Sequence, residues 1–441
     1  MASFGDTILE LSNFIWGVPM IIILMGAHLY FTIRLKFPQR HLFKAMKYYF
    51  TNDKSEGDIS PFASLATALA SCIGTGNIIG VAIAVSLGGP GAVFWCWMTG
   101  VLGMATRYAE TLLAVEYRVK RSSGEMAGGA MYVLERGLNM KWLAVTFALL
   151  TIVASLGIGN TVQANAMATM LHSEFGLSTA ISGGVLAVVV ALVILYGVKG
   201  IAKVASFLVP FMALFYIIGS VTIIIMNSAV LGETISLIFS AAFSAESIGG
   251  GVVGGGVIMA MRYGIARGLF SNESGMGSTP IVAAAARSEN PVKMALIAST
   301  GTFWDTVVIC AITGIVLVSS VIIDPTIDYS SGALLTKQAF SRLPYGSLFL
   351  TITLVCFTFS TILGWSYYAE KAIEYLGNEG AIKYFRVVWV VVAFIGAITS
   401  LDLIWNIADI MNALMTIPNI ISLILLVGVV SKITKEYLPK I

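Results

Sequence analysis

The sequence predicts an all-α polytopic membrane protein with about eleven transmembrane helices. Of its 441 residues, 57% are hydrophobic and only 11% are charged, and the mean hydropathy is +0.89. A helix needs roughly 20 apolar residues to cross the hydrocarbon core, where its backbone must satisfy its own hydrogen bonds, and many segments reach this length. No long polar stretch interrupts the chain, so we expect one integral domain in the lipid bilayer.

Apolar runs between clusters of charge predict the individual spans. They are residues 13–33, 61–87, 90–117, 142–171, 179–198, 202–226, 253–286, 294–322, 345–369, 384–399 and 403–430. Two stretches with a polar face, residues 41–50 and 126–138, are predicted to be amphipathic helices along the membrane surface. The first ten residues hold two acids and no base, so the first span lacks the basic flank of a cleavable signal peptide and we expect it to be retained.

Lysine and arginine predict the orientation. Most of the 26 bases fall in alternate connections or at the span ends beside them, with Arg107 and Arg118 among them. The opposite loops hold Lys337 and Arg342 together with several acids, including Glu246. The positive-inside rule therefore places the amino terminus outside the cell and the carboxyl terminus in the cytoplasm of a multi-pass cell-membrane protein.

Two spans carry residues that weaken a helix at mid-depth. Residues 71–77 read SCIGTGN, and residues 270–280 read FSNESGMGSTP. Each interior glycine costs about 1 kcal/mol relative to alanine, and serine, threonine and asparagine offer the backbone competing hydrogen bonds. Close helix packing is the alternative explanation, but packing needs small residues on one stripe only, whereas these runs are polar around the whole turn. We therefore predict two discontinuous helices.

The two interruptions lie five spans apart, which predicts two halves of inverted topology. Interrupted helices at matching positions of inverted halves indicate the substrate site of a transporter. Amides freed at the amino end of a half-helix attract a carboxylate, and carbonyls freed at a carboxyl end attract a cation or an ammonium group. A zwitterionic amino acid would fit both.

Three motifs resemble those of one transporter family. Residues 88–100 read GGPGAVFWCWMTG, with Cys96 where methionine is usual, residues 74–77 read GTGN, and residues 271–278 read SNESGMGS. Over its whole length the chain resembles the alanine or glycine:cation symporter family, which has the LeuT-type fold. The resemblance implies an extra N-terminal transmembrane helix and a cytoplasmic amphipathic helix in residues 1–60, a first five-helix repeat in 61–226 and a second, inverted repeat in 227–441.

The resemblance also implies a substrate site between core helix 1 (61–87) and core helix 6 (253–286). Backbone amides at 74–77 would bind the substrate carboxylate, and Phe270, Ser271 and Glu273 would face its ammonium group. Gln163 on core helix 3 would limit the pocket, and Trp365 on core helix 8 and Met276 would close it, although such side chains often serve packing alone. The full predicted set is Ser71, Gly74, Thr75, Gly76, Asn77, Gln163, Phe270, Ser271, Glu273, Met276 and Trp365.

Two sodium sites follow from the same resemblance, because oxygen ligands suit a hard cation. The first would use the carbonyls of Ala70, Ile73 and Phe357 with the hydroxyls of Ser360 and Thr361. The second would use Cys72, Asn77, Ser271 and Asp305, with an acid at 305 where relatives have a neutral amide.

Intramembrane carboxylates are expensive in hydrocarbon and point to function. For Glu273, however, neutralisation by Arg262 or Arg267 is an alternative, and Asp305 could equally be a hydrogen-bond anchor. The two arginines themselves are expected to form an extracellular gate or structural pairs.

The sequence therefore predicts sodium-coupled symport of a small neutral amino acid into the cell by alternating access. Alanine and glycine are the expected substrates, with D-alanine, proton coupling and a channel left open as alternatives. Arrangements typical of an intramembrane enzyme, such as HExxH, do not occur in the sequence. Four singly placed cysteines give no metal-site or disulfide pattern, and we expect Na⁺ as the coupling ion, no organic cofactor and no nucleic-acid partner.

Overall fold

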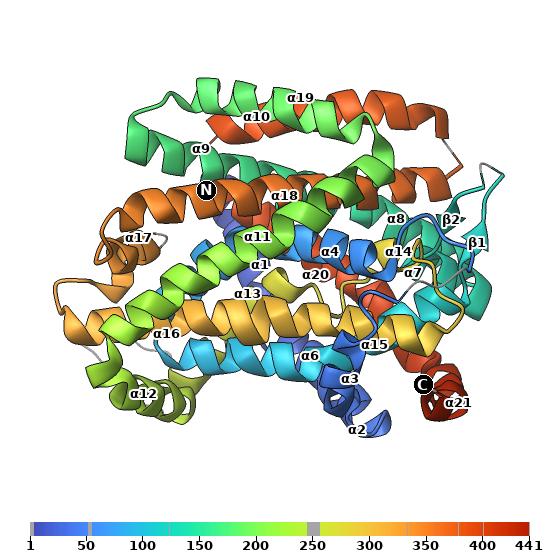
Figure 1. Cartoon of the computed structure of the whole chain (residues 1–441), viewed down its shortest axis with the longest axis horizontal. Coiled ribbons are helices and arrows are strands. Elements are labelled where there is room, and N and C mark those ends of the chain that lie inside the picture. The colour runs from blue at the N-terminus through green and yellow to red at the C-terminus, as the bar shows by residue number, and fades with distance from the viewer. Residues whose placement is uncertain are drawn as a thin grey trace.

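The computed structural model describes residues 4–51, 55–122, 124–244, 256–332, 334–377, 379–399 and 401–440. Long helices run side by side along the molecule (Figure 1). The strands of the described residues are β1 (Val119–Lys120) and β2 (Met126–Ala127), which pair as a short antiparallel hairpin. Apart from this hairpin of two-residue strands, the regular structure of the described residues is helical, which agrees with the predicted all-α fold class.

The helices follow the predicted spans closely. The first span consists of α1 (Phe4–Ile15) and α2 (Val18–Arg34). Between residues 61 and 226 lie α4 (Pro61–Cys72), α5 (Val81–Gly88), α6 (Gly91–Glu116), α8 (Lys141–Leu156), α9 (Val162–Phe175), α10 (Thr179–Ile194) and α11 (Gly197–Met226). After them come α13 (Gly256–Asn272), α14 (Pro280–Ala283), α15 (Pro291–Thr302), α16 (Ala311–Ile323), α18 (Gly346–Tyr375), α19 (Ile382–Ile398) and α20 (Leu401–Leu425).

Length and composition support several membrane crossings. Among the described residues, six helices are long and apolar enough to span a membrane, and the bent pair 61–72 and 76–88 makes a seventh. The other predicted spans are also helical but shorter or less apolar, so the count of eleven and the orientation of the termini stay predictions. Residues 253–255, the start of one predicted span, and Glu246 lie outside the described residues.

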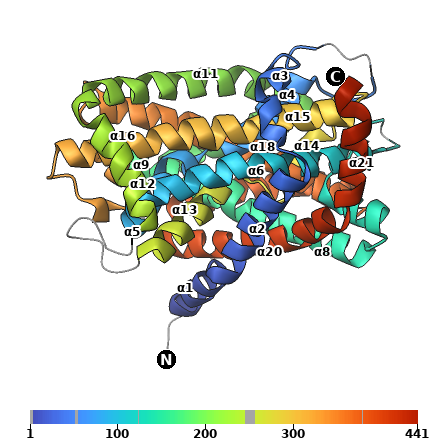
Figure 2. The ribbon, with the colours of Figure 1, turned by 90° about the horizontal axis from the view of Figure 1, so that it is seen from below.

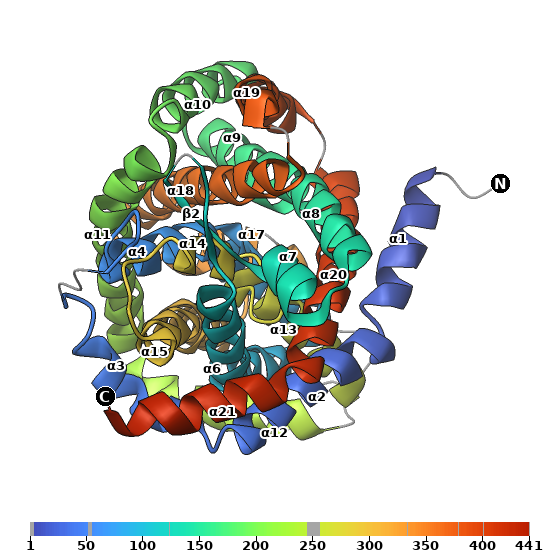
Figure 3. The ribbon, with the colours of Figure 1, turned by 90° about the vertical axis from the view of Figure 1, so that its right-hand side faces the viewer.

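Several helices lie wholly or mostly outside the predicted spans. They are α3 (Leu42–Met46), α7 (Ala130–Tyr132), α12 (Leu231–Phe243), α17 (Leu334–Phe340) and α21 (Val427–Tyr437). Figure 3, seen along the helices, places α4, α13 and α14 inside a ring that includes α6, α11, α18, α8 and α20. The helices that carry the two breaks are therefore enclosed by the others. Helix α1 projects from the bundle towards the amino terminus (Figure 2).

Three local predictions differ from the structure. Residues 126–138 do not form one amphipathic helix, because Met126 and Ala127 pair with β1 and Gly129 adopts a φ of 109° before a short helical stretch begins. Of residues 41–50, only 42–46 are α-helical. The predicted span 403–430 is two helices, since α20 ends at Leu425 and α21 begins at Val427.

The predicted position of Arg107 is wrong. Its side chain belongs to α6 and is only 2% exposed, so it lies inside the protein and not in a connection at the span end.

Backbone hydrogen bonds join the start of core helix 1 to the end of core helix 6. The amides of Asp58 and Ile59 donate to the carbonyl of Ala285 at 2.8 and 3.3 Å, and the amide of Arg287 donates to the carbonyl of Ile59 at 2.9 Å. The guanidinium of Arg118 reaches the same segment and donates to the carbonyls of Ala284, Ala286 and Ser288. We call this end of the bundle, where α4 begins, the inner end, after the orientation that the sequence predicts.

The extra N-terminal span is anchored by buried side chains. The Nδ1 atom of His28 lies 2.8 Å from the hydroxyl of Thr106 on α6, and His28 is fully buried. The indole of Trp16 donates to the carbonyl of Asp409 on α20 at 2.9 Å. Helix α2 and Trp16, which anchors to α20, therefore pack against the bundle, although α1 projects from it.

Candidate functional site

The first break lies between α4 and the π-helical turn Gly76–Gly80 that leads into α5, with a bend of 52°. Two amides freed by the break find side-chain acceptors. The amide of Gly74 donates to Oδ1 of Asn77 at 2.9 Å, and the amide of Thr75 donates to Oε1 of Gln163 at 3.1 Å. Gln163 is itself held by a bond from Nε2 to the carbonyl of Ile158. Core helix 1 therefore offers amide donors to oxygen acceptors, and the binding of a substrate carboxylate by these amides stays a prediction.

Glycine is required at this break by the approach of neighbouring helices. A Cβ on Gly74 would lie 2.5 Å from the Thr361 hydroxyl and 3.0 Å from Oε1 of Gln163. A Cβ on Gly76 would lie 3.1 Å from the Phe270 ring. The two glycines thus let core helices 3, 6 and 8 meet at the break.

The second break runs from Glu273, which follows α13, to Thr279, which precedes α14. Positive φ angles at Glu273, Gly275 and Gly277 (56°, 92° and 79°) unwind the chain here. The Glu273 carboxylate is buried and accepts hydrogen bonds from the Trp365 indole at 3.1 Å and from the Ser278 hydroxyl at 2.5 Å. A carboxylate thus stands in the unwound segment, and core helix 8 provides one of its donors.

The two arginines of core helix 6 have partners other than Glu273. Arg267 makes a bidentate pair with Asp409 of α20, at 2.8 and 3.2 Å, and lies over the rings of Phe270 and Trp405. Arg262 donates to Asn13 of α1 at 2.5 Å. The alternative that either arginine neutralises Glu273 is therefore not supported, whereas structural pairing is observed.

Two charged residues of α6, which the sequence did not single out, hold both ends of the second break. The guanidinium of Arg107 donates to the carbonyl of Asn272, the last residue of α13. One turn later, Oε1 of Glu110 accepts the amide of Gly277 at 3.0 Å and the Asn419 amide group at 2.6 Å. A cation thus meets the carboxyl end of one half-helix, and an anion meets the approach to the next, as the helix dipole favours.

The first predicted sodium ligands are brought together. The Thr361 hydroxyl lies 3.2 Å from the carbonyl of Ile73 and 3.0 Å from that of Phe357. The Ser360 hydroxyl donates to the same Phe357 carbonyl at 2.9 Å, and Ala70 lies on the last turn of α4. These oxygens, from core helices 1 and 8, are the donor type that a hard cation prefers.

The second predicted set is brought together only in part. Asp305 accepts hydrogen bonds from the Asn77 amide at 2.7 Å and from the Ser271 hydroxyl at 2.8 Å. Cys72 instead has its sulfur 3.7 Å from the Arg107 guanidinium. The cysteine beside Ser271 is Cys310, at 3.2 Å.

The remaining predicted substrate residues lie close to the breaks. Phe270 stacks on Trp405 with ring centres 4.9 Å apart, and the Ser71 hydroxyl lies 2.8 Å from the Tyr368 hydroxyl. Met276 is buried within the unwound segment, where its amide donates to the Glu273 carbonyl. All eleven predicted substrate residues are buried.

Acidic groups predominate beside the breaks. In the described part of the chain, Glu110, Glu273 and Asp305 are buried there with the guanidinium of Arg107. If all four are ionised, the region has a formal net negative charge. Because uncompensated charge is costly in a low-dielectric interior, this arrangement favours bound cations or protons.

Comparison with known proteins identifies the family. The model of the sodium:alanine symporter family matches residues 1–441. The sodium/alanine symporter AgcS of Methanococcus maripaludis is 47% identical over 98% of this chain and 97% of its own length. The putative sodium/proton-dependent alanine carrier protein YrbD of Bacillus subtilis is 36% identical over 98% of this chain and 92% of its own length.

A solved structure confirms the predicted LeuT-type fold. The structure of MhsT in complex with L-phenylalanine superposes with a TM-score of 0.64, at 15% identity, over 85% of this chain and 90% of that one. At that identity the likeness establishes the fold alone. Together with the two broken helices, the whole-chain match shows that this protein is a multi-pass membrane transporter, not an enzyme, and belongs to the sodium:alanine symporter family.

Proposed function

We propose that the protein is a sodium-coupled symporter that brings alanine or glycine into the cell by alternating access. The observation that carries this proposal is the meeting of the two helix breaks. Amide donors of Gly74 and Thr75 stand at one break, and the carboxylate of Glu273 stands at the other. These are the complementary groups that a zwitterion needs.

The amide donors would bind the carboxylate of the substrate. Their present acceptors are the neutral side-chain oxygens of Asn77 and Gln163. A substrate carboxylate is a stronger acceptor than an amide oxygen, because charge-assisted hydrogen bonds are roughly twice as strong as neutral ones. The exchange of acceptors would therefore favour binding.

Glu273 would accept a hydrogen bond from the substrate ammonium group. The bulky Trp365 indole already fills the space beside this carboxylate, and Gln163 fills the space beside Gly74. Because both side chains are buried and occupy space at the breaks, they would leave room only for a small substrate side chain. This supports alanine or glycine over larger amino acids, and D-alanine stays open because the same polar groups would serve either enantiomer.

Sodium would be carried with the substrate at the oxygens around Thr361. Its hydroxyl contacts carbonyls of both core helix 1 and core helix 8, so an ion there would hold Ile73 and the adjoining amide donors in place. Coupling requires such differential binding to one conformation. An ion moving through about 100 mV releases roughly 2.3 kcal/mol, and a tenfold gradient adds about 1.4 kcal/mol, enough for several-hundredfold accumulation.

Proton coupling is a second candidate, favoured by the buried acids at the breaks. Glu110 and Asp305 are each enclosed by hydrogen-bond donors, and Glu273 accepts two hydrogen bonds from neutral groups. A carboxylate in such a site could exchange a proton when the site changes access. In that case an inward pH gradient alone would drive uptake.

Uptake into proteoliposomes tests the proposal. The purified protein is reconstituted and given labelled L-alanine, D-alanine, glycine or leucine, each with an inward sodium gradient, with equal sodium on both sides, and with a pH gradient alone. We expect sodium-driven accumulation of alanine or glycine well above that of leucine. Equal leucine transport, or accumulation that ignores sodium, would contradict the proposal.

A further inference from the structure

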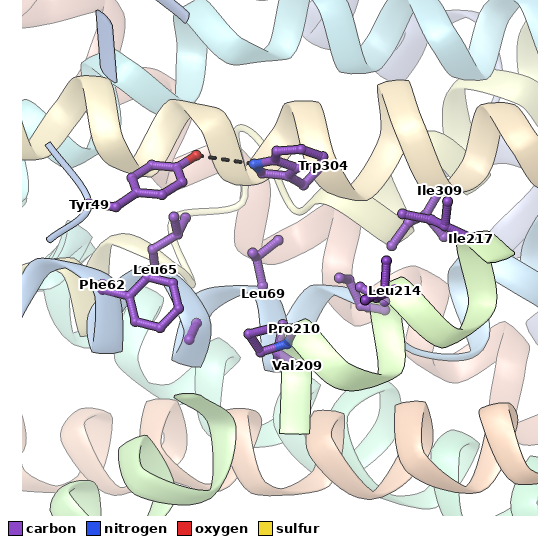
Figure 4. A pocket seen from close by; sticks show the side chains of 13 residues that line it. Tyr49, Phe62, Leu65, Leu69, Val209, Pro210, Leu214, Ile217, Trp304 and Ile309 are labelled. Atoms are coloured by element: carbon purple, nitrogen blue, oxygen red, sulfur yellow. Dashed lines mark hydrogen bonds between the residues drawn. The ribbon is translucent and has the colours of Figure 1, made fainter. Parts of the chain in front are cut away.

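An apolar cavity of about 270 Å³ lies between the first half of core helix 1 and its neighbours. Figure 4 shows Leu65 and Leu69 of α4 facing Leu214 of α11 and Trp304, with Tyr49 at one end. The cavity extends along α4 from its start to Ile73, the residue at the first break. It therefore runs from the inner end of the bundle to the depth of the proposed sodium ligands.

The cavity opens to the lipid side of the bundle. Leu214 lines it and is 59% exposed, and on the same helix Phe207 and Phe211 are 78% and 55% exposed. Large apolar side chains exposed on a membrane helix face the hydrocarbon. A lipid acyl chain thus has direct access.

The polar atoms at the inner end of the cavity are already satisfied. The Tyr49 hydroxyl donates to the Thr300 hydroxyl at 2.6 Å and accepts the Trp304 indole at 3.1 Å, as the dashed line in Figure 4 marks for the second bond. The walls beyond them are aliphatic or aromatic. Because water needs polar partners, a cavity of this kind excludes water and accepts an apolar occupant.

Positive charge lies next to the same end. Lys44 and Lys47 lie five and two residues before Tyr49, and the chain from Arg34 to Thr51 carries five lysines and arginines and no acid. The ammonium group of Lys293, on α15, lies 5.5 Å from the centre of the Tyr48 ring. Clusters of this size beside a membrane helix attract anionic lipid head groups.

We infer that the cavity binds one acyl chain of an anionic phospholipid, whose head group lies on Lys44, Lys47 and Lys293. Charge selects the lipid class, and the apolar cavity holds the chain. Since the chain would pack against α4 up to Ile73, bound lipid would support the segment that carries one of the proposed sodium ligands.

Native mass spectrometry of the full-length protein in mild detergent tests this inference. Delipidated protein is titrated with phosphatidylglycerol or with phosphatidylcholine of identical chains, without substrate or gradient, so the result does not depend on the proposed transport function. We expect saturable binding of phosphatidylglycerol about thirtyfold tighter than that of phosphatidylcholine, from two or more lysines near the head group. Equal binding of the two lipids, or binding that does not saturate, would overturn the inference.

Two pairs of variants locate the site. Ala213→Phe fills the cavity and should abolish saturable binding of both lipids, whereas Val188→Phe, at a 61% exposed position on α10, should not. Lys44→Gln with Lys47→Gln should remove the preference for phosphatidylglycerol and leave binding of the chain, whereas Lys432→Gln with Lys435→Gln on α21 should keep the preference. The lysine variants alter surface residues and do not depend on repacking of the core. Unchanged binding in both test variants would place the lipid elsewhere.

Discussion

The backbone amide of Thr75 donates to Oε1 of Gln163, so that an amide oxygen of core helix 3 caps the break in core helix 1. This oxygen stands where the proposed substrate carboxylate would bind. Gln163 is therefore both a wall of the site and a competitor for its donors.

Two replacements of Gln163 should have separate effects, one on the affinity for alanine and the other on the selectivity against leucine. Gln163→Glu would place a tethered carboxylate at the Thr75 amide, and we expect the KM for alanine to rise about tenfold, the equivalent of one charge-assisted hydrogen bond. Gln163→Ala would enlarge the site, and leucine uptake should then approach alanine uptake. Initial rates of labelled uptake check both. An unchanged KM in Gln163→Glu would remove this residue from the proposed site.

The Thr361 hydroxyl should set the sodium affinity, because it touches carbonyls of both core helices that would hold the ion. In Thr361→Ala we expect the sodium concentration for half-maximal uptake to rise about tenfold, and Thr361→Ser should restore it. Thr358→Ala is the matched control, since that hydroxyl donates only within its own helix, to Leu354 and Val355. Equal sodium dependence in all variants would argue against this ion site.

Added bulk at Gly74 should block transport. A Cβ there would lie 2.5 Å from the Thr361 hydroxyl, whereas a Cβ on Gly80 would meet its nearest neighbour at 3.8 Å. Overpacking of this kind destabilises by about 1–3 kcal/mol. It would lower the population of the packed arrangement, in which Gly74 contacts core helices 3 and 8, by roughly tenfold or more. We expect Gly74→Ala to lose most alanine uptake at normal expression, and Gly80→Ala to retain it. Full activity of Gly74→Ala would show that core helices 1 and 8 do not approach as described.

The α6 pair Arg107 and Glu110 should matter first for stability. Arg107→Ala would remove the charged donor of the buried Asn272 carbonyl, and a buried acceptor left unsatisfied costs about 1–3 kcal/mol, and more where a charged group is involved. Thermal unfolding in detergent should show a large fall in Tm. Glu110→Gln keeps an oxygen acceptor for the Gly277 amide, so its Tm should fall less. The Tm of Glu116→Gln, at the exposed end of α6, should not change. A Tm of Arg107→Ala equal to wild type would contradict the role of this pair.

The sequence predicted the helix breaks well because their cause is local. Glycines and hydroxyl-bearing residues at 71–77 and 270–280 weaken a helix wherever it is placed, and the structure unwinds at both. The oxygens around Thr361 could be anticipated for a related reason, since adjacent hydroxyls on one helix and a broken partner helix form a compact pattern.

Arg107 and Glu110 were missed because their partners are remote. Near the end of an apolar run, an arginine resembles the basic flank of a span. Its actual acceptor, the Asn272 carbonyl, is 165 residues away along the chain. No local sequence pattern predicts that a side chain will bond to a particular distant backbone atom. The hairpin at 119–127 was missed for a different reason: the helix-like polarity pattern of residues 126–138 is overruled by the pairing of Met126 and Ala127 with β1 and by the positive φ of Gly129.

The backbone pairing of residues 58 and 59 with residues 285 and 287 joins the first half of core helix 1 to the second half of core helix 6, so that the two halves are mechanically coupled. These backbone hydrogen bonds link core helix 1 to core helix 6 at the inner end, and the guanidinium of Arg118 holds the second segment through the carbonyls of Ala284, Ala286 and Ser288. A movement that opens this end of the bundle must therefore either carry both segments together or break these backbone hydrogen bonds.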